Sequence, residues 1–339
     1  MIVALILGGL LVFSLLGNLQ QFANGLDLKG RPGRHSHLRL EEVTVEQNSS
    51  RHKIALVDVS GIITSEAWDR GGNNLVTLVE DQLRLAGTDR AVKAVLLKVD
   101  SPGGEVLASD DIARAISDFQ KEYDKPVVAS MGGLAASGGY YVSVPCRWIV
   151  ANELSITGSI GVIMHSYNYR GLLSKVGVRP EVFKSGKFKD MLSGEKTEEE
   201  ILPEERQMIQ SLIDETFDKF KKVVAEGRKF ANETNGDEGR KLVGNWQEYA
   251  DGRVLSGKQA YEYGFVDELG NLDTAVERAK ALADIRDANL VQYQQPFNIG
   301  NLFRFFGEAE GRTVKIDVGL QLPKLQVGRL YFLSPTVLH

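Results

Sequence analysis

The stretch that decides the fold of this chain is GGLAASGGYY at residues 132–141, which directly follows the strand-like run VVAS at residues 127–130. Its serine, Ser137, lies between two glycine pairs, at the point where a strand turns into a helix. Such a turn lifts a serine clear of its neighbours and surrounds it with backbone N–H groups, as an acyl-transfer nucleophile requires. The plain alternative is a glycine-rich turn with a capping serine. Ser137 is therefore a candidate nucleophile that needs a base and an oxyanion hole.

Apolar runs rich in β-forming residues alternate with segments of helical spacing on the N-terminal side of this stretch. We expect strands at 54–59, 92–99 and 126–130, and helices at 75–85 and 106–123. Strands that alternate with helices in this way are parallel and joined by crossover helices. Shorter apolar runs follow at 149–150, 160–164, 169–176 and 181–184. The sequence predicts an α/β domain of stacked strand–helix units.

The C-terminal half contains three predicted helices. The segment 203–228 has an amphipathic stripe that suits core packing or a subunit contact. Ser256 and Gln259 form a capping box for a second helix that Gly264 can end. A third helix is expected at 273–283.

The chain divides into four parts by composition. Residues 1–19 are almost entirely apolar and just long enough for a membrane anchor, although a signal peptide is the alternative. Residues 20–52 are expected to be a linker, 53–295 a folded, enzyme-sized domain and 296–339 a C-terminal tail that could pack on a neighbour. Basic residues follow the apolar segment at 29, 31, 34 and 39, and the positive-inside rule would then place the body in the cytoplasm.

Composition excludes several function classes. The net charge of −5 gives no electrostatic reason to expect nucleic acid as a partner. The single cysteine, Cys146, excludes an intramolecular disulfide and reads as a buried structural thiol. The five histidines form no metal-binding pair on a helix, so we expect no metal and no cofactor.

A second glycine-rich turn, DSPGG at residues 100–104, follows the strand expected at 92–99. Without Cβ atoms, a glycine pair can turn its backbone N–H groups toward a developing oxyanion. Two such turns on consecutive strand–helix units favour a catalytic interpretation of Ser137.

The residues alone leave the base open. His165 ends an apolar run, and histidine is a common general base near neutral pH, but this residue could equally cap a strand. The other candidates are the lysines of KSGKFKD at residues 184–190. A lysine acts as a base only when neutral, which requires burial to lower its pKa by roughly 3 units. Asp190 would oppose that change if it pointed toward such a lysine.

Four ordered motifs resemble those of the signal peptide peptidase A family. They are DSPGG at 100–104, ASGGYY at 136–141, TGSIGV at 157–162, and KSG followed two residues later by KD at 184–190. The likeness covers about residues 53–285 and includes ADGRV at 250–254 and GFVD at 264–267. This resemblance implies the fold shared by Clp-type peptidases and crotonases, and a serine endopeptidase with a Ser-Lys dyad.

The resemblance also implies roles for individual residues. Ser137 would be the nucleophile, Lys189 the general base and Ser159 the residue that orients the lysine, while the N–H groups of Gly104 and Gly138 would form the oxyanion hole. The substrates would be remnant signal peptides or other apolar peptides near a membrane. The family further implies a homo-oligomer in which the serine and lysine come from neighbouring protomers. It also implies a single-pass protein of the cell membrane whose catalytic domain faces outward. This orientation is the opposite of the one that the basic residues after the apolar segment favour.

Two other enzymes remain as alternatives. One is a Clp-type protease that uses Ser137 and His165, for which the sequence assigns no third, orienting acid. The other is a crotonase-like acyl-CoA enzyme that uses the same oxyanion turns. Cleavage specificity and the size of the oligomer do not follow from the sequence.

Overall fold

The computed structural model describes residues 38–68, 72–236, 238–296 and 330–333. The predicted anchor at residues 1–19 lies outside these ranges. Within them, no helix combines the length and the apolar character that crossing a membrane requires.

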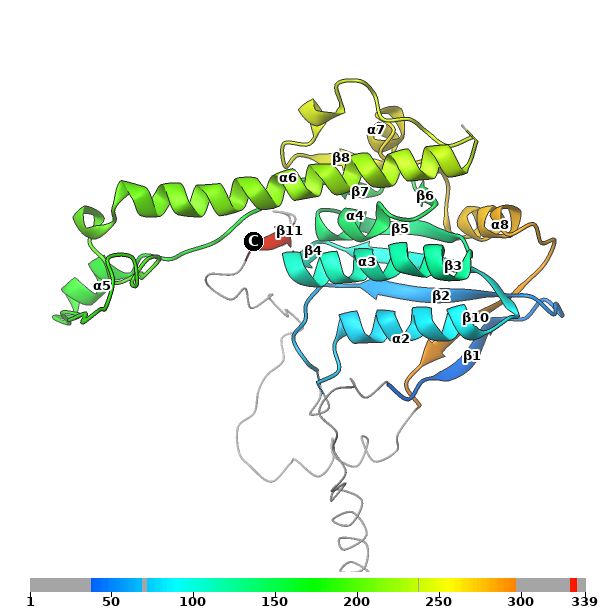
Figure 1. Ribbon diagram of the computed structural model, residues 1–339, viewed down its shortest axis with the longest axis horizontal. Helices are drawn as coiled ribbons and strands as arrows, with labels where there is room; N and C mark the ends of the chain where they lie inside the picture. The colour runs from blue at the N-terminus through cyan, green and yellow to red at the C-terminus, as the bar shows by residue number, and fades with distance from the viewer. Residues whose placement is uncertain (1–37, 69–71, 237, 297–329, 334–339) are drawn as a thin grey trace, which may run out of the picture. The chain divides into compact units, whose positions relative to one another are not determined.

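A mixed, mainly parallel sheet forms the centre of the described structure (Figure 1). Its main path runs in the order β1-β10-β2-β3-β5-β6-β9, and β7 adds to β5 and pairs with β8. The strands β10, β2, β3, β5, β6 and β9 are parallel, whereas β1 is antiparallel to β10. The strand bounds are β1 Glu41–Glu46, β2 Lys53–Ser60, β3 Val92–Ser101, β5 Val127–Ala135, β6 Trp148–Ala151, β7 Ile156–Gly158, β8 Val254–Ser256, β9 Glu268–Leu269 and β10 Asn289–Gln294.

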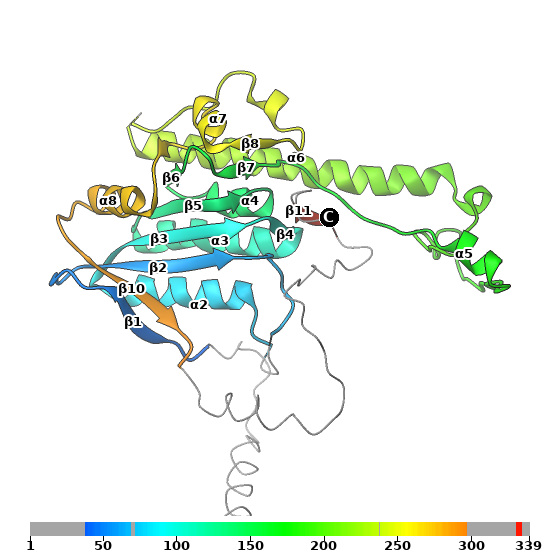
Figure 2. The ribbon, with the colours of Figure 1, turned by 180° about the vertical axis from the view of Figure 1, so that it is seen from behind.

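Helices cover both faces of this sheet. Helices α2 (Leu75–Thr88) and α3 (Val106–Tyr123) pack on one face, where Val57, Val95 and Leu97 point. Helix α8 (Leu272–Leu282) packs on the other face, against Leu56, Leu96 and Val128 (Figure 2). Because alternate residues of a strand point to opposite faces, the continuous apolar runs of β2 and β3 supply both cores.

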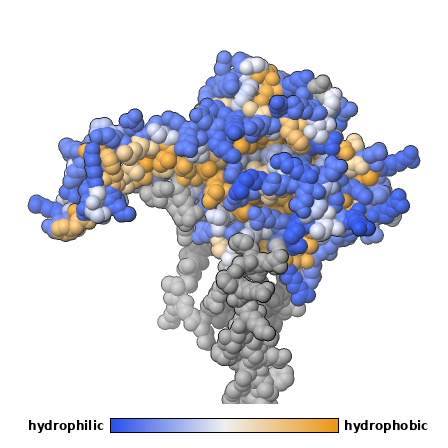
Figure 3. Space-filling model, viewed as in Figure 1, coloured by the Kyte–Doolittle hydropathy of each residue, from blue (hydrophilic) through white to orange (hydrophobic). Residues whose placement is uncertain are grey.

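Helix α6 (Pro203–Thr234) joins this body to an arm (Figure 1). In its C-terminal half, Phe220, Val224 and Arg228 are buried. Its N-terminal half belongs to the arm, which we define as residues 165–216 and which also contains α5 (Arg170–Lys175) and the short helix η1 (Glu198–Glu200). Figure 3 shows apolar surface along the arm. Its most exposed apolar residues are Tyr167, Leu172, Val176 and Phe183.

A fully buried ion pair fastens α6 to the body. Arg228 donates from Nη1 to Asp267 Oδ2 over 2.9 Å and also bonds the other carboxylate oxygen through Nη2. Asp267 accepts further hydrogen bonds from the backbone nitrogens of Ile149 and Arg240, at 2.8 and 3.1 Å. The burial of Arg228 lowers its pKa, but the charge of Asp267 outweighs this and leaves it above its ordinary value. Arg228 therefore stays charged in the interior, paired with Asp267.

The α/β class and the five elements expected before residue 131 are confirmed. Two expectations are corrected. Residues 41–46, expected in the linker, form β1. Val43 and Val45 alternate with polar residues, but the run is short and all six side chains are exposed, so pairing with β10 makes the strand. The run 169–176 is mostly the helix α5 and has no buried residue, so its apolar side chains are surface residues of the arm.

A separate two-stranded sheet joins distant parts of the chain. Strand β11 (Tyr331–Leu333), from the predicted tail, pairs antiparallel with β4 (Gly103–Glu105), so that Phe332 lies opposite Gly104. Tyr331 also exchanges two backbone hydrogen bonds of 3.1 Å with Ile163. The strand β11 therefore lies between β4 and the chain that leads into the arm. The predicted GG turn at 103–104 is thus the start of a short strand.

Candidate active site

Ser137 lies in the turn between β5 and the short helix α4 (Gly138–Ser143). Its backbone has φ 55° and ψ −116°, a conformation that costs a non-glycine residue of order 1–3 kcal/mol. The residue is 1% exposed, and among the described residues its Oγ has no hydrogen-bond partner. A strained backbone and an unpaired buried hydroxyl are typical of a functional serine rather than of a structural cap.

The helix α4 is anchored by its own tyrosines. Tyr140 donates its hydroxyl to the carbonyl oxygen of Phe265 over 3.0 Å, and Tyr141 donates to Asp110 Oδ1 over 2.6 Å. Burial raises the pKa of both phenols, so both remain protonated donors at neutral pH. These bonds fix the helix that begins directly after Ser137.

The two glycine-rich turns meet at Gly138. A Cβ atom on Gly138 would lie 2.7 Å from Ser109 Oγ, 3.0 Å from Gly103 Cα and 3.1 Å from the backbone nitrogen of Gly104. Gly103 has φ +100°, and a Cβ there would lie 2.6 Å from the backbone nitrogen of Gly138. Only glycine permits this approach. The structure thus brings together the two residues, Gly104 and Gly138, whose N–H groups the resemblance assigns to the oxyanion hole.

Ser159 lies beside the same turn. The backbone nitrogen of Ser137 donates to the carbonyl oxygen of Gly158 over 2.8 Å, and Ser159 itself has φ 51° and is 3% exposed. The backbone nitrogen of Ser159 donates to the carbonyl oxygen of Arg253 over 2.7 Å. Arg253 donates two hydrogen bonds of 2.7 Å to the carboxylate of Asp251, and these bonds lower the pKa of Asp251 to about 2. The ADGRV motif therefore supports Ser159, a role that the sequence alone did not show.

Lys189 does not complete the site within one chain. It lies on the arm, in the loop between α5 and η1, and its side chain is exposed. Because the hydroxyl of Ser137 makes no hydrogen bond among the described residues, Lys189 does not bond it. The burial that a neutral lysine requires is likewise absent for Lys189 in the described chain.

His165 does not bond Ser137 either. Its side chain is partly buried, and its Nε2 has no hydrogen-bond partner among the described residues. The structure thus assembles the nucleophile turn, the glycine backbone and Ser159, and leaves both candidate bases away from the hydroxyl. Cys146 is completely buried, and burial raises the pKa of its thiol, so it has no place in this chemistry. The described residues hold no group of three or more His, Cys, Asp or Glu that could bind a metal.

Two features near the site were missed from the sequence. The first is Phe332 on β11, completely buried beside Tyr141 and Phe220 with ring centroids 4.9 and 4.6 Å away. The predicted tail, residues 296–339, contains no motif that would indicate a buried aromatic residue at this position. The second is the buried Lys196 in the arm, 2.6 Å from Glu205 Oε1. No sequence pattern distinguishes it from the exposed lysines nearby.

Comparisons with known proteins relate the chain to a family of proteases. Residues 119–286 match the model of peptidase family S49. Over 262 residues the chain is 37% identical to the "Putative signal peptide peptidase SppA" of Enterococcus faecium, covering 75% of this chain and 71% of that protein. It is 33% identical to "Protease 4" of Haemophilus influenzae, over 73% of this chain and 38% of that longer protein. Among solved structures, a membrane-bound stomatin-specific protease aligns with a TM-score of 0.40 at 14% identity, over 68% of this chain and 85% of that chain.

Proposed function

This chain belongs to peptidase family S49 and is a serine endopeptidase, and from that premise we propose that it cleaves remnant signal peptides or other apolar peptides with Ser137 as nucleophile and Lys189 as general base. The observation that carries the proposal is the buried hydroxyl of Ser137, which has no hydrogen-bond partner among the described residues and lies on a strained turn beside Gly104 and Gly138. We also propose that the domain has the fold shared by Clp-type peptidases and crotonases.

The proposed reaction has two steps. In acylation, Ser137 Oγ attacks the peptide carbonyl carbon while neutral Lys189 Nζ takes its proton. The C–N bond then breaks and Lys189 passes that proton to the leaving amine. In deacylation, water gives a proton to Lys189 and attacks the ester, and Ser137 recovers the proton as it leaves. The N–H groups of Gly104 and Gly138 stabilise the oxyanion in both steps, and Ser159 orients the lysine.

We further propose that Lys189 serves the Ser137 of a neighbouring copy in a homo-oligomer. Two observations support this. Lys189 is exposed on the arm of its own chain, and its own Ser137 has no hydrogen-bond partner among the described residues. The arm also exposes large apolar side chains, including Phe183 at 94%, and contact with a second copy would remove them from water. That contact would also bury the lysine, which favours its neutral form.

The test uses separate and mixed variants in a peptide-cleavage assay. Ser137→Ala and Lys189→Ala are each expected to abolish cleavage, whereas His165→Gln retains it. Oligomers assembled from equal amounts of Ser137→Ala and Lys189→Ala chains should recover about a quarter of the wild-type rate, because random neighbours in a closed ring then complete one site in four. Full activity of Lys189→Ala would overturn the dyad, and no recovery in mixed oligomers would overturn the shared site.

The cellular location belongs to the same proposal. Residues 1–19 would anchor the protein in the cell membrane as a single span, with the catalytic domain outside the cytoplasm and near its apolar substrates. A fusion of alkaline phosphatase to the C-terminus tests the orientation, since that reporter is active only outside the cytoplasm. An inactive fusion in intact cells would place the domain inside.

A further inference from the structure

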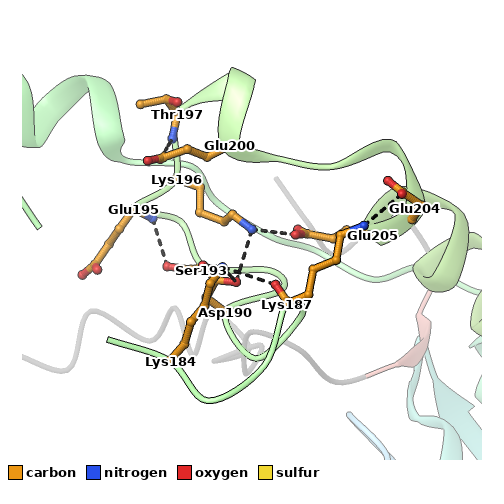
Figure 4. A network of polar contacts seen from close by, with 10 residues as sticks. All are labelled: Lys184, Lys187, Asp190, Ser193, Glu195, Lys196, Thr197, Glu200, Glu204 and Glu205. Carbon is orange, nitrogen blue, oxygen red and sulfur yellow. Dashed lines mark hydrogen bonds and ion pairs between the residues drawn. The ribbon is translucent and has the colours of Figure 1, made fainter. Parts of the chain in front are cut away.

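A buried lysine lies close to the proposed base. Lys196 is 6% exposed, and its Nζ lies 2.6 Å from Oε1 of Glu205, which is 3% exposed in the first turn of α6. A buried charge is costly unless it is paired, so this contact fixes where the segment before α6 can lie. Figure 4 shows Lys196 between Glu205 and Asp190.

Asp190, the residue after Lys189, completes the network. Lys196 Nζ lies 3.4 Å from Asp190 Oδ1, and Lys184 Nζ lies 2.8 Å from both Asp190 oxygens. Asp190 therefore ties the loop that carries Lys189 to Lys184 within the loop and to Lys196 near its end, and Lys196 continues the network through Glu205 to α6. The backbone of the loop adds a bond of 3.2 Å from the nitrogen of Lys189 to the oxygen of Gly186.

The charges in this network balance. Lys184 and Lys196 are matched by Asp190 and Glu205. The hydrogen bond from Lys184 is the main cause that holds the pKa of Asp190 below its ordinary value. Burial lowers the pKa of Lys196, but its hydrogen bonds to Glu205 and Asp190 outweigh that effect and raise it. The other charged pair of the loop, Lys187 with Glu204 at 3.1 Å, is more than half exposed on both sides.

We propose that Lys196, held by Glu205, is a positioning residue for Lys189: it fixes the loop against α6 and compensates the charge of Asp190, so that Asp190 does not hold Lys189 in its protonated form. This inference rests on the proposed role of Lys189 as base. Misplacing a reacting group by about 1 Å can cost on the order of a hundredfold in rate. An uncompensated carboxylate next to a lysine favours the charged lysine.

The central variant is Lys196→Met, which keeps the length of the side chain and removes its charge. We expect kcat/KM to fall by about tenfold or more. We also expect the limb of the pH profile on which Lys189 loses its proton to move to higher pH. Lys196→Arg should keep most of the wild-type kcat/KM and the position of the pH limb, because arginine keeps the positive charge.

Lys187→Met is the matched control in the same loop. It removes one lysine charge two residues from Lys189, but from an exposed pair that contributes little. Its rate and its pH limb should stay close to those of the wild type. A merely structural role for Lys196 would lower the rate without moving the limb.

Glu205→Gln provides a second route, because Lys196→Met leaves Glu205 buried without a partner and could unfold the arm. In Glu205→Gln, Lys196 keeps its charge beside Asp190, so kcat/KM should fall while the pH limb stays in place. Circular dichroism melting shows whether each variant is folded.

The outcomes separate the two proposals. If Lys189→Met retains activity, the base assignment fails, whatever Lys196→Met does. If Lys189→Met is inactive while folded Lys196→Met keeps the wild-type rate and pH limb, the positioning role is overturned and the base assignment stands. If Lys196→Met does not fold, an unchanged rate in Glu205→Gln overturns the positioning role instead.

Discussion

The backbone nitrogen of Ser137 donates a 2.8 Å hydrogen bond to the carbonyl oxygen of Gly158. This bond ties the strained turn to the strand β7, which in turn pairs with β8 from the ADGRV region. The position of the Ser137 hydroxyl is therefore set by three separate segments of one chain. None of these contacts involves Lys189, so the geometry of the Ser137 turn does not depend on that residue.

Replacing Ser137 by alanine should abolish cleavage without weakening the fold. Among the described residues the buried Oγ atom has no hydrogen-bond partner, so removing it eliminates an unsatisfied polar group. We expect kcat to fall by about 10⁴-fold or more, while the melting temperature stays the same or rises. Peptide cleavage and calorimetry measure the two effects. A marked loss of stability would mean that the hydroxyl has a structural partner.

Gly138→Ala should destabilise the protein and abolish activity, because its Cβ would press on Ser109 and on the backbone of Gly103 and Gly104. Gly133→Ala is the matched control in the same stretch, since a Cβ there has nothing within 4 Å. Urea unfolding and a peptide assay compare the pair. Equal behaviour of the two variants would contradict the close approach described at Gly138.

Arg228→Met should lower the free energy of unfolding by about 3–5 kcal/mol, because it leaves Asp267 charged and buried without its partner. Lys222→Met, which breaks an exposed pair with Glu226 on the same helix, should change it by less than about 1 kcal/mol. Denaturant titrations of both variants measure the difference. A loss for Arg228→Met no larger than that of the control would show that α6 is held by other contacts.

Phe332→Ala should cost about 3–5 kcal/mol of stability, because the ring is completely buried among Tyr141 and Phe220. Phe230→Ala, at a ring that is 38% exposed on α6, should cost clearly less. Thermal melts of the two variants test this. If the two losses were equal, β11 would not be packed on β4 in solution.

The Asp251–Arg253 pair should make a small, acid-sensitive contribution to stability. The pKa of Asp251 is lowered to about 2, from about 3.9 in an unfolded chain. Its contribution is therefore present above pH 4 and lost as the pH falls toward 2. Both side chains are half exposed, so Asp251→Asn should cost less than about 1 kcal/mol at neutral pH. Urea titrations between pH 3 and 7 should show the gap between the proteins narrowing as the pH falls.

The sequence predicted the α/β class and the turn at Ser137 because both depend on local patterns. Strand–helix alternation marks the parallel sheet, and glycine pairs mark the two turns that meet at Gly138. The pairing of Gly104 with Gly138 came instead from the family resemblance, and the structure brings the two residues close together.

Long-range pairing explains what the sequence did not predict. The strand β1 is exposed along its whole length, and the short β11 comes from a tail without alternation, so only their partners make them strands. Lys196 is buried because Glu205, from the helix α6, pairs with its charge. The sequence does not show this pairing, and lysines are usually exposed to solvent. The roles of Lys189 and Ser159 came from family motifs and remain predictions.

The pairing of β11 with β4 has a consequence for protein synthesis. The ribosome makes Glu105 226 residues before Tyr331, a delay of about ten seconds or more at common elongation rates. Throughout that interval the edge of β4 that later pairs with β11 lacks this partner, and an unpaired strand edge is a template for pairing with another extended chain. The nascent domain therefore completes this edge last, after translation of the segment that covers it.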